Sequence, residues 1–187
     1  MCRSRWTGLT LIGTIQCGQP GLWRKNMQTS SSTVQLDSID RAILVALQRE
    51  GRIANQALAE RVHLSPSACL RRVKALEDAG VIAAYVALLN PRAVGRPGTS
   101  YTIINLESTQ PAVRQAFEQA VQDTAEILDC HYVAGANDYL VRFTYRDAED
   151  LERFHADVLA RLPGVVRSNS MLVLRTVKRT TALPLPD

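Results

Sequence analysis

Signatures of metal sites and of enzymes are missing from this 187-residue sequence. Its three histidines are scattered, and its four cysteines show neither paired spacing nor an accompanying His/Cys cluster. His131 follows Cys130 in a predicted strand, where neighbouring side chains point to opposite faces and cannot chelate one ion. GxSxG, P-loop and glycine-rich dinucleotide motifs are absent as well. The sequence therefore favours a protein that is not an enzyme and has no metal or other cofactor.

Long hydrophobic runs are missing too. The modest apolar stretch at residues 9–15 is far shorter than a membrane span, and Cys17 lacks the small-residue pattern of a processed signal. Two interpretations of residues 1–35 fit these features: a disordered segment, or a mis-assigned extension upstream of a true start at Met27. A weak export signal is a further, less favoured interpretation of this segment.

The net charge of +4 is not spread evenly along the chain. Residues 1–35 hold four Lys/Arg and no acid, residues 36–90 hold seven and six, and residues 91–187 hold eleven and twelve. Because the excess lies in the N-terminal segment, the net charge alone does not indicate nucleic-acid binding. Cys69 and Cys130 fall at apolar periodic positions, as reduced cysteines of cytoplasmic proteins do.

Residues 54–80 predict two helices joined by a tight turn. Asn55 is the expected cap of the first helix, and Ser65 that of the second, whose first position holds Pro66. Gly80 follows the second helix, where a left-handed residue ends a helix at little cost. The spacing predicts that Leu58, Ala59 and Val62 of the first helix and Cys69, Val73 and Leu76 of the second face inward.

The second helix is predicted to present a basic outer face. Ser65 and Ser67 lie near its start, and Arg71, Arg72 and Lys74 follow on the outer surface. This pattern is typical of a DNA recognition helix, in which the N-terminal turns meet base edges and cations further along meet phosphates. The alternative interpretation is an ordinary helical hairpin with a solvated basic face.

A third helix and an apolar run flank this pair. Asp37 is the expected cap of the preceding helix, Asp40 occupies the capping-box position, and Gly51 ends the helix. The partly β-branched run at 81–89 has the length of a small two-stranded wing or of a strand leading out of the domain. Residues 36–90 therefore predict a winged helix-turn-helix. The buried stripe of the third helix is predicted to comprise Ile39, Ile43, Leu44 and Leu47.

The remaining residues predict a second domain at 100–180, after a linker at 91–99 and before a flexible tail at 181–187. Its predicted order is βαββαβ, the ferredoxin-like arrangement of an antiparallel sheet with both helices on one face. The fold class is therefore α+β. Because the other face of such a sheet is uncovered, we expect self-association. The predicted strands are 100–106, 127–133, 139–145 and 165–178, and the predicted helices are 111–123 and one capped by Asp147.

Three blocks of the first domain resemble a known family. They are LDSIDRAIL (36–44), LSPSACLRRVKALEDAGVI (64–82) and the LNP exit (89–91), and they are similar to the DNA-binding domain of the Lrp/AsnC family. The resemblance extends over about residues 36–178. His63 stands in the turn where the family commonly has Gly. If this position needs a positive φ, we expect a small strain and the same fold.

Two blocks of the second domain resemble the family's amino-acid-sensing and dimerisation module, the RAM domain. They are LDCHYVAGANDYLVRF (128–143) and RLPGVVRSNSMLVL (161–174). Ala136 replaces an acidic residue that is frequent in the family, which leaves the identity of the effector open. Carried over from these motifs, the candidate ligand-binding residues are Gly135, Asn137, Asp138, Tyr139, Ser168 and Ser170, the two serines standing where the family often has Thr.

An α-amino acid presents a carboxylate, an ammonium group and a variable side chain, so a site for it needs N–H donors, an acceptor and an adjustable pocket. Gly135 allows close backbone approach, and Asp138 supplies the only carboxylate in the hairpin loop. The alternative is that residues 135–138 are ordinary turn chemistry with no ligand.

The resemblance implies a cytoplasmic, nucleoid-associated, sequence-specific transcriptional regulator of amino-acid metabolism that responds to a small amino acid. The implied partners are double-stranded DNA, this effector, and further copies of the chain in a homodimer and a higher oligomer such as a tetramer of dimers; no membrane is involved. Two alternatives stay open: an architectural DNA-binding protein that needs no ligand, and a regulatory subunit that senses amino acids for an enzyme.

Overall fold

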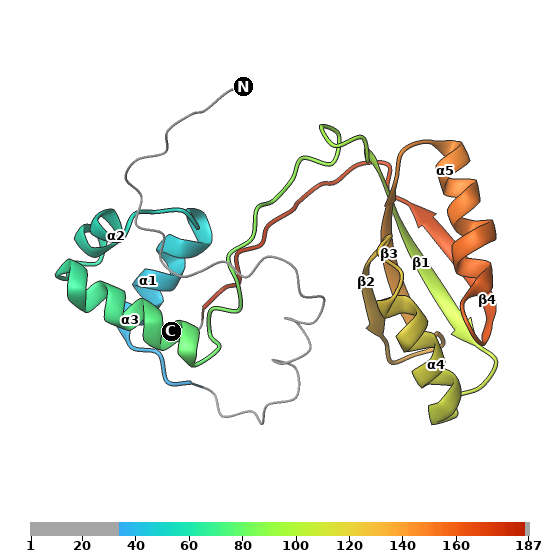
Figure 1. Ribbon diagram of the computed structural model, residues 1–187, viewed down its shortest axis with the longest axis horizontal. Helices are drawn as coiled ribbons and strands as arrows, with labels where there is room; N and C mark the ends of the chain where they lie inside the picture. Colours follow the sequence, from blue (N-terminus) through green and yellow to red (C-terminus); the bar gives the residue numbers. More distant parts are fainter. Residues whose placement is uncertain (1–33, 186–187) are drawn as a thin grey trace, which may run out of the picture. The chain divides into compact units, whose positions relative to one another are not determined.

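The computed structural model describes residues 34–185, which form two compact units (Figure 1). The helical unit comprises residues 34–86 and 181–185, and the sheet unit comprises residues 87–180. The interpretations of residues 1–35, including a start at Met27, concern positions that, except for the last two, lie outside the described residues. Among the residues described, no helix is both long and apolar enough to cross a membrane.

The helical unit contains three helices at the predicted places: α1 (Ser38–Arg49), α2 (Asn55–Arg61) and α3 (Pro66–Asp78). The capping box of α1 is formed, because Asp40 N donates to Asp37 Oδ1 at 2.8 Å and Asp37 N donates to Asp40 Oδ2 at 3.3 Å. All three helices turn their apolar stripes toward one core. Its buried residues are Ile43, Leu44, Ala46, Ile53, Leu58, Ala59, Val62, Cys69, Val73 and Leu76.

Of the two caps predicted for α2 and α3, one is formed and the other is not. Ser65 caps α3 by accepting from Ala68 N at 3.3 Å, and His63 has a φ of 56°, so its turn position does require the left-handed conformation. Asn55, however, does not cap α2. It is already the first helical residue, so its side chain reaches across and donates from Nδ2 to Pro66 O at 2.8 Å.

The run at 81–89 forms no strand in this structure, so the predicted strand was wrong for the chain by itself. A strand needs a neighbour for its backbone hydrogen bonds, and the described part of the helical unit contains no other strand. The first two residues of the run, Val81 and Ile82, pack against the core of the helical unit, and its later part is exposed: Val86, Leu88 and Leu89 each keep about two thirds of their surface in solvent.

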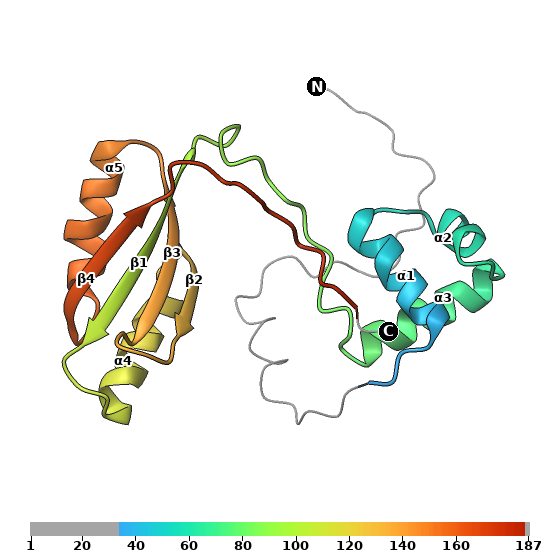
Figure 2. The same cartoon turned by 180° about the vertical axis from the view of Figure 1, so that it is seen from behind.

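The sheet unit has the predicted βαββαβ order, with strands arranged β2-β3-β1-β4 and every neighbouring pair antiparallel. Helices α4 and α5 both cover the same face of this sheet (Figures 1 and 2). The last strand stops at Leu172, six residues before the predicted end, where its pairing partner β1 approaches its own start. The elements are β1 (Gly98–Leu106), α4 (Pro111–Gln122), β2 (Ile127–Tyr132), β3 (Tyr139–Tyr145), α5 (Ala148–Arg153) and β4 (Val165–Leu172).

Within the sheet unit, a buried carboxylate fastens the linker to α5. Asp150, in the first turn of α5, is 2% exposed and accepts from Arg96 of the linker at 3.1 Å and from Arg146 N at 3.0 Å. Arg153 donates to it at 3.1 Å and also pairs with Glu126. The hydrogen bond from Arg146 N, together with the guanidinium groups of Arg153 and Arg146, lowers the pKa of Asp150 to about 2. As predicted, Asp147 caps α5 by accepting from Asp150 N.

Residues 181–185 are not a free tail, which corrects the prediction for 181–187 over its described part. Leu183 N donates to Gln48 Oε1 at 2.5 Å, and Gln48 Nε2 donates to Leu183 O at 3.2 Å. Leu185 packs against the core of the helical unit. The tail therefore belongs to that unit because a side-chain amide of α1 satisfies both backbone groups of Leu183.

Candidate nucleic-acid interface and effector site

The outer face of α3 carries the predicted DNA-contacting residues. Ser67, Arg71 and Lys74 are exposed, and they lie opposite the buried stripe of Cys69, Val73 and Leu76. Ser65 is also exposed, but its hydroxyl caps the helix and lies 3.3 Å from that of Ser67. The two hydroxyls therefore sit at the N-terminal end of α3, with two free-standing cations one and two turns further along.

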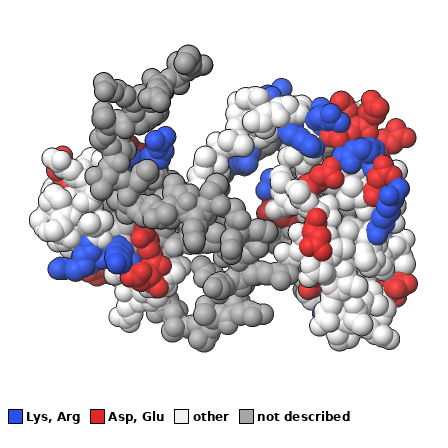
Figure 3. Space-filling view, viewed as in Figure 1, with Lys and Arg blue, Asp and Glu red and all other residues white. Residues whose placement is uncertain are grey.

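Arg72 departs from this pattern. Its guanidinium is 2.7 Å from Asp37 Oδ2 and 2.7 Å from Asp40 Oδ1, and its side chain is only 32% exposed. On the helical unit, basic and acidic side chains indeed lie next to one another (Figure 3). The pKa of Asp37 is lowered, chiefly by the hydrogen bond from Asp40 N and then by Arg72. Arg72 thus ties α3 to the start of α1, a role that the helical spacing did not reveal because its partners lie more than thirty residues away.

The loop between β2 and β3 holds three of the six ligand candidates, Gly135, Asn137 and Asp138. Gly135 has a φ of 140°, and a side chain added there would meet nothing within 4 Å, so its backbone is open to an approaching molecule. Asn105 Nδ2 donates to Ala136 O at 3.2 Å, and Asp138 Oδ2 accepts from Leu106 N at 2.8 Å. The Asp138 carboxylate therefore binds the end of β1, rather than only its own loop as the turn interpretation suggested.

Tyr139 and the two serines are placed by the sheet register. Tyr139 pairs with Ile104, which in turn pairs with Ser168, so the three residues form one row across β3, β1 and β4. The Tyr139 ring is 1% exposed, and its hydroxyl donates to Glu118 at 2.7 Å, which commits the side chain to the core beneath α4. Ser170 lies one row along, with its hydroxyl 2.7 Å from that of the buried Thr102.

The six candidate residues differ in how accessible they are to a ligand. Asn137 and Asp138 are half-buried and Gly135 is exposed at the hairpin loop, near the end of the sheet that also holds Ser168. Tyr139 has only its backbone available to a ligand. Ser168 lies two strands from Tyr139, a separation of about 10 Å at ordinary strand spacing.

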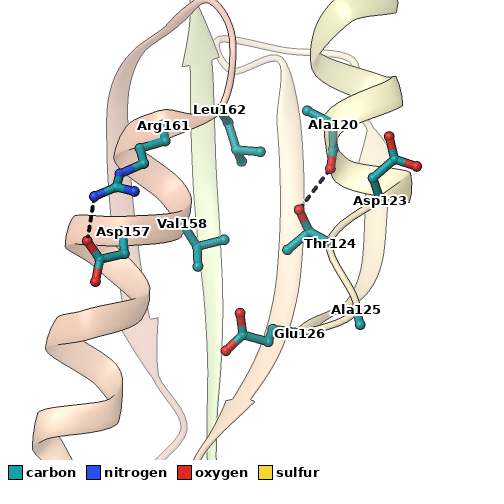
Figure 4. A pocket seen from close by; sticks show the side chains of 9 residues that line it. All are labelled: Ala120, Asp123, Thr124, Ala125, Glu126, Asp157, Val158, Arg161 and Leu162. Carbon is teal, nitrogen blue, oxygen red and sulfur yellow. Dashed lines mark hydrogen bonds and ion pairs between the residues drawn. The ribbon is translucent and has the colours of Figure 1, made fainter.

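A hollow of about 410 Å³ lies elsewhere on the sheet unit, between the end of α4 and the helical turns that follow α5 (Figure 4). None of the predicted ligand residues lines it. Two polar side chains of its wall already have partners within the wall: Thr124 donates to Ala120 O, and Arg161 forms an ion pair with Asp157. Its lining residues are Ala120, Asp123, Thr124, Ala125, Glu126, Asp157, Val158, Arg161 and Leu162.

The thiols and histidines are not assembled into a metal site in the described part of the chain, where no group of three or more His, Cys, Asp or Glu is close enough to hold an ion. Cys130 pairs with Val141 and His131 with Leu140, so the two side chains point to opposite faces of the sheet. Burial and the nearby Glu118 raise the pKa of Cys130 to about 12, and burial raises that of Cys69, which leaves both as unreactive thiols.

Both units match known domain families. Residues 36–83 match the family described as winged helix-turn-helix DNA-binding, and residues 99–183 match the Lrp/AsnC ligand binding domain. The leucine-responsive regulatory protein of Haemophilus influenzae is 42% identical over 150 residues, which is 80% of this chain and 90% of that protein. The protein of the same name in Escherichia coli is 41% identical over 148 residues, or 79% and 90% of the two chains.

Solved structures of related regulators are similar to this chain as well. A transcriptional regulator of Neisseria meningitidis, crystallised with L-methionine, is 39% identical with a TM-score of 0.77 and covers 80% of this chain and 97% of its own. A feast or famine regulatory protein of Mycobacterium tuberculosis, also with L-methionine, is 30% identical with a TM-score of 0.72 and covers 80% and 99%. With a helix-turn-helix unit for DNA and an amino-acid-binding sheet unit, the chain belongs to the Lrp/AsnC family of transcriptional regulators.

Proposed function

We propose that this protein controls genes of amino-acid metabolism by binding operator DNA through α3 and by responding to an aliphatic amino acid at the β2–β3 loop. The observation that carries the proposal is the outer face of α3. Ser67, Arg71 and Lys74 have no partner within the chain beyond the Ser65–Ser67 contact, among the interactions of the described residues. A hydroxyl near the helix start followed by cations supports base contacts there and phosphate contacts further along.

The effector is proposed to bind with its ammonium group at Asp138 and its carboxylate at backbone N–H groups near Gly135. The open backbone at Gly135 and the half-buried carboxylate of Asp138 support this orientation. Relatives named for leucine and structures solved with L-methionine support an aliphatic side chain. Ser168, at the same end of the sheet, is a candidate for contacting the ligand, whereas Ser170 is proposed only as its support through Thr102.

Self-association is proposed to occur through the sheet face that α4 and α5 leave uncovered. Tyr101 and Met171 are neighbours on this face and are 38% and 46% exposed, and Ile103 and Leu140 form the next row. Arg142 and Asp129 form an ion pair beside them. An apolar centre with a charged border supports a homodimer, from which a tetramer of dimers is assembled. A cytoplasmic, nucleoid-associated location follows from the DNA partner.

A gel-shift experiment with and without each of the twenty amino acids tests this function. We expect a specific duplex to shift and at least one amino acid to change the shift. A shift that no amino acid alters would indicate an architectural protein, and the absence of any shift would favour a subunit that regulates an enzyme. Either result contradicts the proposal.

A further inference from the structure

The outer stripe of α3 contains one residue whose chemistry differs from that of its neighbours. Leu70 lies three residues after Ser67 and four before Lys74, beside Arg71, and its side chain is 43% exposed. It is more exposed than the seven partly buried side chains that pack against the hydrophobic cluster of the helical unit. A branched apolar side chain therefore stands alone among a hydroxyl and two cations.

An exposed aliphatic residue is not unusual in itself, and Val45 on α1 is 38% exposed. The surroundings of Leu70 make the difference. With polar and cationic neighbours on its stripe, Leu70 is not the centre of an apolar patch that another protein could cover. In the major groove of DNA, by contrast, phosphates border a floor of base edges, and thymine presents an apolar methyl group there.

We propose that Leu70 reads the 5-methyl group of a thymine in each operator half-site. This inference rests on the proposed function, in which α3 enters the major groove. Leu70 is the fifth residue of α3, within the N-terminal half that contacts base edges in this geometry, while Arg71 and Lys74 beside it are left for phosphates or guanine. The structure thus assigns Leu70 a part in specificity and gives it none in non-specific binding.

A double-mutant cycle between protein and DNA tests the assignment. The full-length protein first selects duplexes from a random-sequence pool, and each thymine of the selected site is then replaced by deoxyuridine, which lacks only the methyl group. For the parent, we expect one replacement per half-site to weaken binding about fourfold, the factor that corresponds to about 0.8 kcal/mol for one buried methyl-sized group. For Leu70→Ala, the same replacement should have no further effect. Val45→Ala, the truncation of a similarly exposed aliphatic side chain on α1, should behave as the parent.

The outcomes separate the two proposals. If the parent selects a specific site but no deoxyuridine replacement weakens its binding, or if replacements weaken Leu70→Ala as much as the parent, Leu70 is not the reader and the proposed function stands. If the pool yields no specific site, the proposed function itself fails. Thermal unfolding of Leu70→Ala checks that the variant is folded, and the deoxyuridine scan of the parent can overturn the assignment without any variant.

Discussion

At the scale of single residues, three cations on α3 that look alike in the sequence have different roles. Arg71 and Lys74 are exposed, whereas Arg72 bridges Asp37 and Asp40 at the start of α1. A guanidinium held by two carboxylates is poorly placed to neutralise a phosphate, because it would first have to leave both partners. Arg72 is therefore expected to act on the packing of α3 against α1.

The first prediction separates these roles by alanine substitution. Arg71→Ala and Lys74→Ala should leave the melting temperature nearly unchanged, as surface substitutions do, and should lower the slope of log K against log salt by about one unit per lost phosphate contact in each bound domain. Arg72→Ala should instead lower the melting temperature of the helical unit. Arg61→Ala, which removes the exposed ion pair between Arg61 of α2 and Glu50 at the end of α1, is the control for both measurements. Equal binding by Arg71→Ala, Lys74→Ala and the parent would exclude this face as the reader.

The second prediction concerns Asp138, where structure and ligand binding compete for one carboxylate. Asp138→Asn keeps an oxygen for Leu106 N but loses the charge proposed to pair with an ammonium group. Since a hydrogen bond to a charged group is worth about 1.5–3 kcal/mol, we expect amino-acid affinity to fall at least tenfold while the protein stays folded and still binds DNA. Calorimetric titration measures the affinity.

Asp138→Ala is the matched comparison, because it also leaves the nearly buried Leu106 N without its acceptor. It should lose about 1–3 kcal/mol of stability in addition to the ligand response. Undiminished amino-acid binding by Asp138→Asn would remove this loop from the effector site.

At the scale of elements, Asp150 joins α5 to the linker. Its pKa is lowered to about 2, so the carboxylate stabilises the fold when it is ionised, at pH values above its ordinary pKa near 3.8. That stabilisation is lost as the pH falls from about 4 toward 2. The difference between the two pKa values corresponds to about 2 kcal/mol.

The third prediction follows from the lowered pKa of Asp150. The sheet unit of the parent should lose about 2 kcal/mol more stability between pH 5 and pH 2 than that of Asp150→Asn, as followed by urea unfolding with a probe in that unit. Asp157→Asn removes an exposed carboxylate that pairs with Arg161 on the same segment, so it should keep the acid sensitivity of the parent. If Asp150→Asn loses stability on acidification as steeply as the parent, Asp150 is not the group responsible.

At the scale of the whole molecule, the proposed homodimer would link the uncovered sheet face to DNA binding by α3. The fourth prediction is that Ile103→Glu, which places a charge in the apolar centre of that face, yields a monomer in sedimentation experiments. Operator affinity should fall with it, since a dimer engages two half-sites with recognition helices about one turn of DNA apart. Ala116→Glu places the same charge at an exposed position of α4, on the helix-bearing side of the sheet unit, and serves as the control. A dimeric Ile103→Glu protein would assign the interface to another surface.

The fifth prediction concerns coupling between effector and DNA. An effector changes DNA binding only by its differential affinity for the two arrangements of the assembly, typically 1–3 kcal/mol. By reciprocity, the Kd of the amino acid should differ by about 5- to 150-fold between free protein and protein saturated with operator. Fluorescence titration under both conditions measures it. Identical Kd values would mean that nothing is transmitted between the sites.

The sequence alone determined the features that depend on neighbours within a turn of helix or along a strand. The capping box at Asp37, the Ser65–Pro66 start of α3 and the left-handed turn at His63 follow from local geometry, and the βαββαβ order follows from the succession of periodic segments. The resemblance to the Lrp/AsnC family, carried by short blocks of sequence, extended this to function.

Tertiary structure alone decided which predicted site residues are free. Arg72 meets Asp37 and Asp40, and Tyr139 turns its ring under α4, because the fold brings together segments far apart in the sequence. The run at 81–89 has the composition of a strand, yet pairing needs a neighbour that composition does not supply. Side-chain spacing specifies a face, whereas the partner across that face depends on packing, and packing is set by the chain as a whole.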